Sequence, residues 1–243
     1  DEQNAAFVAT GHYARILQSS DGKVELWRAS DLAKDQSYML SNLTQRELER
    51  SILPLGELRK PEVRAIAQSL GLTVSETPDS QDLCFLDRED YQDFLRKNAP
   101  SATQPGEIRT TRGQLLGTHQ GLAYYTIGQR KGLPAYSEAL YVLEKKTATN
   151  TLSVGTASQL GSSRFLAGPV NWISGTTPDF PLECGIKIRY RANPVQSTVF
   201  DSGSGSVTVE TTQCLRDITP GQSAVFYVGE KVLGGGIIRA ERG

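Results

Sequence analysis

The stretch "SAVFYVGEKVLGGGIIRA", residues 223–240, contains two short apolar runs separated by Gly229 and Glu230. Runs rich in β-branched and aromatic residues and bounded by turn residues predict strands. Three similar runs precede them at spacings of about ten residues, and "DSGSGS" (201–206) between two of these predicts a hairpin tip. Five short strands in series favour a small antiparallel barrel or a sandwich.

The first hundred residues follow a different pattern from this C-terminal stretch, because strands alternate with helices there. Residues 6–10 predict a buried strand and residues 23–29 a second strand. A capping box at residues 44–47 predicts the start of one helix. The run "KPEVRAIAQSLG" (60–71) predicts a longer one, and a short helix follows residue 91. The N-terminal part therefore belongs to the α/β class.

The composition changes near residue 97, where Pro and Gly become frequent and helical periodicity disappears. Short alternating runs then continue to about residue 163. We therefore expect three domains: an α/β domain over residues 1–97, a small central domain rich in short strands over 98–163, and an all-β domain over 164–243.

The composition excludes several classes of protein. Of the 243 residues, 38% are hydrophobic and 22% are charged, as in globular proteins. No apolar run approaches the roughly 18 to 20 residues that span a bilayer. We expect neither a membrane nor DNA as a partner, because the net charge of −1 gives no overall basic footprint. Residues 101–150 nevertheless carry six basic and three acidic side chains, so a polyanion would bind at local patches.

The cysteines and histidines argue against a metal centre. Three cysteines lie far apart, at 84, 184 and 214, and only His12 and His119 could join them. We therefore expect no protein-bound metal. An odd cysteine count without a secretion signal favours a reducing cytoplasm. Because the chain begins at Asp1, directly before a strand-like run, we expect it to be a piece of a longer protein.

Cys84 stands out because its neighbours in "TPDSQDLCFL" (77–86) are polar, whereas structural cysteines usually have apolar neighbours. Nearby acids oppose ionisation of the thiol, so a resting thiolate is not expected. The pattern suits a solvent-facing cysteine that accepts sulfur from a partner, and a structural cysteine fits about equally well. Cys184 and Cys214 lie in strand patterns and are expected to be structural.

Four further motifs each allow a functional and a plain interpretation. "ATGHY" (9–13) is either a tight turn or a backbone approach to a ligand after a strand. "KDQSY" (34–38) is either a solvated loop or a binding segment. "TIGQRKGL" (126–133) suits a mobile basic loop that touches phosphate, or a solvated hairpin. "KIRYR" (187–191), if it lies on a strand, places three cations on one face, which favours a polyanion contact.

Taken together, these motifs resemble those of the tRNA-specific 2-thiouridylase family. "ATGHYAR", "KDQSYML", "LGELRKPEVRAIAQSLGL", "DSQDLCFL", "PGEI", "YTIGQRKGL", "KIRYR" and "TPGQSAVFY" occur in the family's order over nearly the whole chain. The resemblance implies a sulfurtransferase that replaces the C2 oxygen of the wobble uridine in tRNA. ATP, with Mg²⁺ accompanying it, adenylates that oxygen, and a cysteine persulfide charged by a sulfur-donor protein delivers the sulfur. The implied fold is the remnant of a PP-loop nucleotide-binding α/β domain, a small central domain and a C-terminal antiparallel β-barrel.

The resemblance also assigns residues. Cys84 falls on the persulfide cysteine and Gly11 on an ATP-contacting glycine. The implied tRNA contacts are His12, Lys34, Asp35, Gln36, Arg189, Tyr190 and Gln222.

The sequence departs from the family in three respects. It contains no Ser-Gly-Gly-x-Asp-Ser phosphate loop, and it lacks the first catalytic cysteine, which pairs with the persulfide cysteine, and the aspartate before it. All three are expected before Asp1. Two alternatives therefore remain beside the enzyme: a tRNA-binding module without catalysis, and another ATP-pyrophosphatase relative that acts on a different acceptor.

Overall fold

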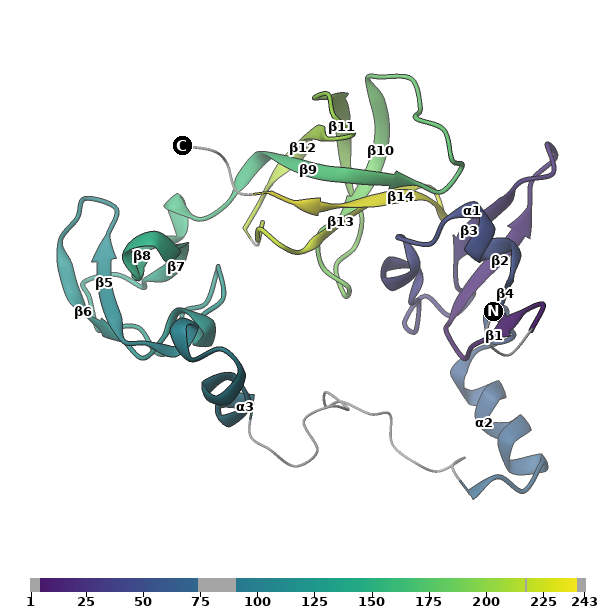
Figure 1. The fold of residues 1–243 in the computed structure, drawn as a ribbon, viewed down its shortest axis with the longest axis horizontal. Coiled ribbons are helices and arrows are strands. Elements are labelled where there is room, and N and C mark those ends of the chain that lie inside the picture. The colour runs from purple at the N-terminus through teal and green to yellow at the C-terminus, as the bar shows by residue number, and fades with distance from the viewer. Residues whose placement is uncertain (1–4, 74–90, 217, 240–243) are drawn as a thin grey trace. The chain divides into compact units, whose positions relative to one another are not determined.

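The computed structural model describes residues 5–73, 91–216 and 218–239 (Figure 1). The chain forms two compact units. The first, here called the barrel unit, comprises Asp1–Thr77, Ser163–Gln213 and Thr219–Gly243, and the second, the central unit, comprises Pro78–Ser162 and Cys214–Ile218. The three-domain division at residues 97 and 163 stays a prediction.

Six strands close into an antiparallel barrel. Their order is β13-β10-β11-β12-β9-β14, and β13 also pairs with β14, which completes the ring. The strands are β9 (Ser162–Trp172), β10 (Leu182–Lys187), β11 (Val195–Asp201), β12 (Val207–Leu215), β13 (Ser223–Val228) and β14 (Lys231–Ile238). Closure decides between the two expected architectures, because a ring leaves no free sheet edges. All five strands expected from the sequence are confirmed, as is the hairpin tip at 201–206.

The N-terminal hairpin continues the barrel sheet. β2 (Ala14–Gln18) pairs with β3 (Val24–Arg28), and β3 pairs with β14 through Trp27 opposite Lys231 and Leu26 opposite Val232. The resulting core joins Leu26 (0% exposed) and Val232 (1% exposed) to residues from both ends of the chain. This joining was not expected, because the hairpin was assigned by sequence to a separate α/β domain.

The rest of the N-terminal part packs beside this hairpin. β1 (Val8–Ala9) and β4 (Ser51–Ile52) form a parallel pair, and the helical elements are η1 (Ser37–Leu40), α1 (Gln45–Glu49) and α2 (Lys60–Ser69). The expected capping interaction is present at α1, where the Thr44 backbone N–H donates to Glu47 Oε2 at 2.7 Å. Gly56 is required here, since a Cβ would lie 2.0 Å from the Ala14 carbonyl oxygen.

The strand expected over residues 6–10 forms only at Val8–Ala9, and the expectation that it is buried was wrong. Phe7 and Val8 are each 57% exposed. The reason is that β1 has a single strand neighbour, β4, so its apolar side chains are not covered by the residues described. Helix α2 is similar, because none of its residues is buried.

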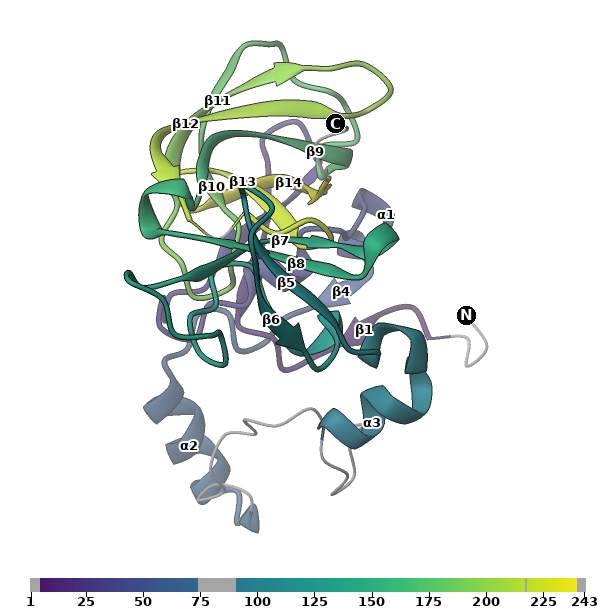
Figure 2. The same cartoon turned by 90° about the vertical axis from the view of Figure 1, so that its left-hand side faces the viewer.

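The central unit has a four-stranded sheet of order β6-β5-β8-β7. Its four strands are labelled in Figure 2. Its core is built by residues such as Ile108, Val142, Leu152 and Val154, each 0% exposed. The strands are β5 (Gly106–Thr110), β6 (Leu115–His119), β7 (Tyr141–Lys146) and β8 (Thr151–Gly155). The helical elements are α3 (Tyr91–Asn98), η3 (Pro100–Thr103), η4 (Leu122–Tyr124), η5 (Thr147–Thr149) and η6 (Ala157–Gln159). The expected short strands and the helix after residue 91 are confirmed.

Among the residues described, no helix is both long and apolar enough to cross a membrane.

Candidate functional site

Gln36 ties the "KDQSY" segment to the turn that contains Gly11 and His12. Its backbone N–H donates to the Tyr13 carbonyl at 2.7 Å, and its side-chain Oε1 accepts the Tyr13 N–H at 2.9 Å. His12 Nδ1 lies 2.7 Å from Thr10 Oγ1, which orients the imidazole ring. Two of the segments singled out in the sequence are therefore adjacent.

Asp35 carries a buried carboxylate, 4% exposed, that is used within the protein. Its Oδ2 accepts from Arg28 Nε at 3.0 Å, and its Oδ1 accepts the backbone N–H groups of Ala29 and Ser37 at 3.2 and 3.1 Å. A buried carboxylate needs this degree of hydrogen bonding. The carboxylate therefore holds the segment in shape, and a ligand would have to reach the segment through its backbone or its neighbours.

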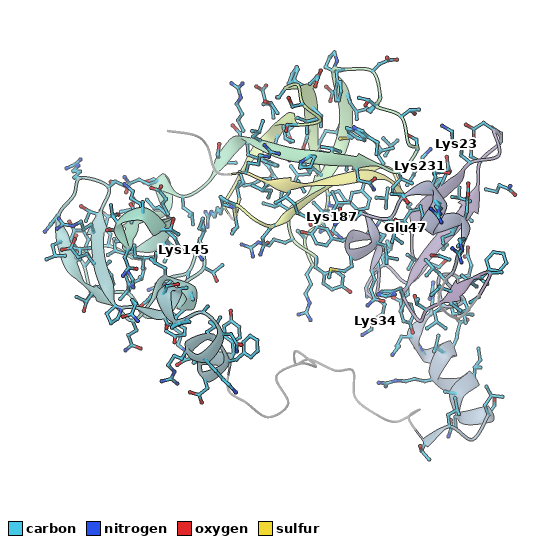
Figure 3. All side chains as sticks on the ribbon, viewed as in Figure 1. Lys23, Lys34, Glu47, Lys145, Lys187 and Lys231 are labelled. Carbon is cyan, nitrogen blue, oxygen red and sulfur yellow. The ribbon has the colours of Figure 1, made fainter. Side chains whose placement is uncertain are left out.

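Lys187, which is labelled in Figure 3, is buried as well. Only 3% of its surface is exposed. Its Nζ lies 5.9 Å from the ring centroid of Tyr38 and 5.8 Å from that of Tyr227, within the range of cation–π attraction. Burial lowers the pKa of Lys187, while Asp35 opposes that shift. Burial likewise raises the pKa of Tyr38 and of Tyr227. The arrangement fastens the "KDQSY" segment to strands β10 and β13.

The expectation that "KIRYR" presents a cationic stripe on one face of a strand was wrong. β10 ends at Lys187, and residues 188–191 form a bend and a turn. Lys187 is inside the protein, so only Arg189 and Arg191 remain as accessible cations. The strand cannot continue because β10 pairs with β13 only up to Lys187.

The turn after β10 lies against two other segments. Arg189 Nη2 donates to Thr219 Oγ1 at 3.0 Å, and the Tyr190 ring lies 6.5 Å from the Tyr38 ring. Burial raises the pKa of Tyr190, Asp35 adds to this, and Lys34 and Arg191 oppose it, so these charges are close to its hydroxyl. The Gln222 N–H donates to the Thr219 carbonyl at 3.1 Å, which places Gln222 in the loop that Arg189 contacts.

Most of the residues selected from the sequence therefore meet in the barrel unit. The segment 34–36, the turn 189–190 and the loop 219–222 are far apart in the chain but adjacent in space. Lys34 and Lys187 are both labelled in Figure 3. Cys84 lies outside the residues that the structure describes. Sequence reasoning missed Arg28 and Tyr38 and misplaced Lys187, because nothing local in "KIRYR" indicates that Tyr38 and Tyr227 cover its first residue.

A groove of about 710 Å³ lies on the other side of the His12 turn. It is lined by Thr10 and Leu53, which directly follow the parallel strands β1 and β4, and by His12, Thr44 and Arg46. Ligands of open α/β sheets bind at the carboxyl ends of parallel strands. Gly11 has no strained backbone, and a Cβ there would make an ordinary contact, 3.6 Å from Leu55 Cδ1. No described residue therefore requires a glycine at this position.

The described cysteines differ in environment. Cys184 is 2% exposed, and its burial raises the pKa of the thiol to about 12, whereas Cys214 is exposed. Within the described ranges, no three His, Cys, Asp or Glu residues are grouped closely enough to hold a metal ion.

Comparison with known proteins places these features in a family. Three family models match in succession: the tRNA methyl transferase HUP domain over residues 1–88, the tRNA methyl transferase PRC-barrel domain over 92–156, and the aminomethyltransferase β-barrel domain over 162–238.

Curated relatives match along nearly the entire chain. A tRNA-specific 2-thiouridylase MnmA of Chloroflexus aurantiacus is 44% identical over 95% of this chain and 65% of its own length. Those of Heliobacterium modesticaldum and Symbiobacterium thermophilum are 45% and 43% identical over 96% of this chain, and 62% and 60% of their own lengths. The chain thus spans less than two thirds of the length of each of these relatives. With its HUP-like part, its PRC-barrel domain and its closed six-stranded barrel, the chain belongs to the tRNA-specific 2-thiouridylase family.

Proposed function

We propose that the protein catalyses the ATP-dependent 2-thiolation of the wobble uridine of tRNA. This chain would supply the sulfur-carrying Cys84 and part of the tRNA-binding surface. The relatives that match 95–96% of the chain are named tRNA-specific 2-thiouridylases. The observation that carries the proposal is the convergence of segments 34–36, 189–190 and 219–222 in the barrel unit, because residues that bind one ligand have to share a surface.

The accessible groups of this surface suit an RNA backbone. Arg191 and Tyr190 are exposed on the turn after β10, and Tyr190 is 37% exposed, which leaves a ring face and a hydroxyl for a nucleotide. The charge of Lys34 acts on Tyr190, where it opposes the rise in the hydroxyl pKa that burial causes, and Arg189 belongs to the same turn as Tyr190. Arginine and lysine contacts to phosphate fix the register of a nucleic acid without reading its sequence.

The proposed chemistry has two steps. ATP transfers its adenylyl group to the C2 oxygen of the uridine, and pyrophosphate leaves. The outer sulfur of a persulfide on Cys84 then attacks C2, and AMP departs with the oxygen. A second cysteine, expected before Asp1, cleaves the remaining sulfur–sulfur bond, which yields the thiouridine and a disulfide with Cys84.

In this scheme ATP binds in a groove of the chain itself, whereas the sulfur comes from another protein. We assign ATP, with its Mg²⁺, to the groove beside Gly11 and His12, since that groove lies where the parallel strands end. His12 would contact the tRNA at the rim of the groove. The persulfide would come from a sulfur-donor protein, and the reducing cytoplasm would be the setting of the reaction.

A second candidate is a tRNA-binding module without catalysis. Such a module would bind tRNA through the same adjacent segments around Arg189 and Thr219 and would need no sulfur-carrying cysteine. A relative that acts on a different acceptor is disfavoured, since the three family models together match most of the chain in the order HUP, PRC-barrel and β-barrel.

The test compares Cys84→Ser with Cys214→Ser in the complete protein. We expect Cys84→Ser to abolish 2-thiouridine formation, measured by retardation of tRNA on an organomercury gel, while tRNA affinity stays within about twofold because the binding groups lie elsewhere. Cys214→Ser should act like the wild type. Thiouridine formation by Cys84→Ser would refute the role of Cys84, and a wild type that binds tRNA without modifying it would favour the module.

A further inference from the structure

The loop at residues 126–132 of the central unit is the other basic motif that the sequence singled out, and none of the residues assigned above lies in it. The sequence allowed either a mobile basic loop or a solvated hairpin, and in the structure hydrogen bonds to β7 hold the backbone of this segment. The Gly128 N–H donates to the Val142 carbonyl at 2.8 Å, and the Val142 N–H donates to the Gln129 carbonyl at 2.9 Å. Val142 belongs to β7 and is 0% exposed, so the loop is anchored in the core of the unit.

Gln129 closes the loop internally. Its Oε1 accepts the Thr126 N–H at 3.0 Å, and its Nε2 donates to the Lys131 carbonyl at 2.9 Å. Its own N–H donates to the Thr126 carbonyl at 3.0 Å. Gly128 (φ 85°) and Gly132 (φ 79°) bracket the tip in left-handed conformations that side chains adopt only with strain. The backbone conformation between them is therefore specified from both sides.

Two cations stand at the tip of this loop. Arg130 and Lys131 are both exposed, and neither side chain has a hydrogen bond or an ion pair with any residue that the structure describes. The cations on the strands of the unit are engaged: Arg109 pairs with Glu107 at 2.7 Å, Lys146 with Glu144 at 3.7 Å, and Lys145 donates to the Tyr125 carbonyl at 3.2 Å. Arg112 is also exposed, but it lies alone in the turn between β5 and β6, whereas Arg130 and Lys131 are adjacent on one fixed loop tip.

We propose that Arg130 and Lys131 form a phosphate-binding site for the RNA backbone, which gives the central unit a tRNA contact of its own. This inference rests on the proposed function. An arginine fork can grip two oxygens of one phosphate, and the adjacent lysine supplies a point charge for the same or the next phosphate. A loop whose backbone is already fixed loses little conformational entropy when it binds.

The experiment is a salt titration of tRNA binding to the complete protein, using an unmodified tRNA transcript. The Arg130→Ala/Lys131→Ala variant should weaken binding about tenfold at moderate salt, and it should flatten the plot of log affinity against log salt by nearly two contacts. The matched control, Arg109→Ala/Lys146→Ala, removes the same charge from the same unit. Because those two cations are already paired, its slope should stay at the wild-type value.

A third variant tests the role of the fixed backbone. Gln129→Ala keeps both charges but removes the side-chain bonds to the Thr126 N–H and the Lys131 carbonyl, so it should lose part of the affinity, about threefold, with a smaller change in slope. The thermal midpoint of the charge variant should equal that of the wild type, since both side chains are exposed.

The outcomes separate the two proposals. No tRNA binding by the wild type would overturn the proposed function. Wild-type binding together with an unchanged slope in Arg130→Ala/Lys131→Ala would overturn this inference alone. Equal losses in that variant and in its control would show that only net charge matters. A variant that binds tRNA normally but loses sulfur transfer from the donor protein would assign the loop to that protein instead.

Discussion

Two basic segments look alike in sequence and differ in the structure. "KIRYR" (187–191) and "GQRK" (128–131) each group cations within five residues, and both were expected to be exposed. In the first segment, Lys187 is buried between the rings of Tyr38 and Tyr227 and so holds the "KDQSY" segment against strands β10 and β13. The second holds its backbone rigidly and exposes both charges. A cluster of cations therefore shows where charge lies in the chain, and only tertiary contacts show whether that charge is available to a ligand.

The largest effect is expected where the buried charges depend on one anion. Asp35→Asn would leave Arg28 and Lys187 without a counter-charge, and the new amide would place a donor against Arg28 Nε. We expect the free energy of unfolding to fall by about 3 to 5 kcal/mol, the cost typical of removing one member of a buried pair. Urea unfolding measures it.

The control is Glu57→Gln. Glu57 is 66% exposed and lies 3.8 Å from Arg15, so its loss should cost under about 1 kcal/mol. If both substitutions cost the same, the Asp35 carboxylate would not be the centre of a buried charge cluster.

A smaller effect is expected at Arg189, the half-buried arginine of "KIRYR". Arg189→Ala should weaken tRNA binding by about 1.5 to 3 kcal/mol, the range for a hydrogen bond to a charged group, and reduce the salt slope by about one contact. Filter binding over a range of salt concentrations measures both. An unchanged slope would mean that Arg189 serves only to hold Thr219.

The smallest effect at neutral pH is expected from Lys187→Met, which keeps the length of the side chain and removes its charge. Replacing a buried charge by an apolar side chain of similar volume is often close to neutral, so the change in stability should be within about 1 kcal/mol at pH 7.

The pH dependence of Lys187→Met gives the sharper measurement. The pKa of Lys187 is lowered by burial, so between that lowered value and the ordinary lysine value of 10.5 the unfolded chain binds more protons than the folded one. The wild type should therefore gain stability relative to Lys187→Met as the pH rises toward 9.5, below the ordinary tyrosine pKa. Parallel stability curves would show that the environment of Lys187 does not disfavour its charged form.

The sequence predicted barrel strands β10 to β14 and the short strands of the central sheet, because those runs lie between turn signals, but it did not predict β2, β4 or β9. It also predicted helix α2, since Pro61 and Gly71 mark its two ends. It did not predict that β3 pairs with β14, because such pairing depends on residues at opposite ends of the chain. The candidate site shows the same limit: Asp35 and Gln36 were selected by resemblance, but that their side chains bond within the protein depends on Arg28 and Tyr13.

The pairing of β3 with β14 also has a consequence for biosynthesis. Trp27 and Lys231, which are partners in that pairing, are about 200 residues apart, so at 5 to 20 residues per second the ribosome needs about 10 to 40 s between them. Throughout that interval β3 is paired with β2 on one edge only, and its other edge, which later pairs with β14, has no partner strand. The nascent chain therefore carries an open sheet edge until β14 has been synthesised, and truncation before β14 would leave that edge permanently available to other strands.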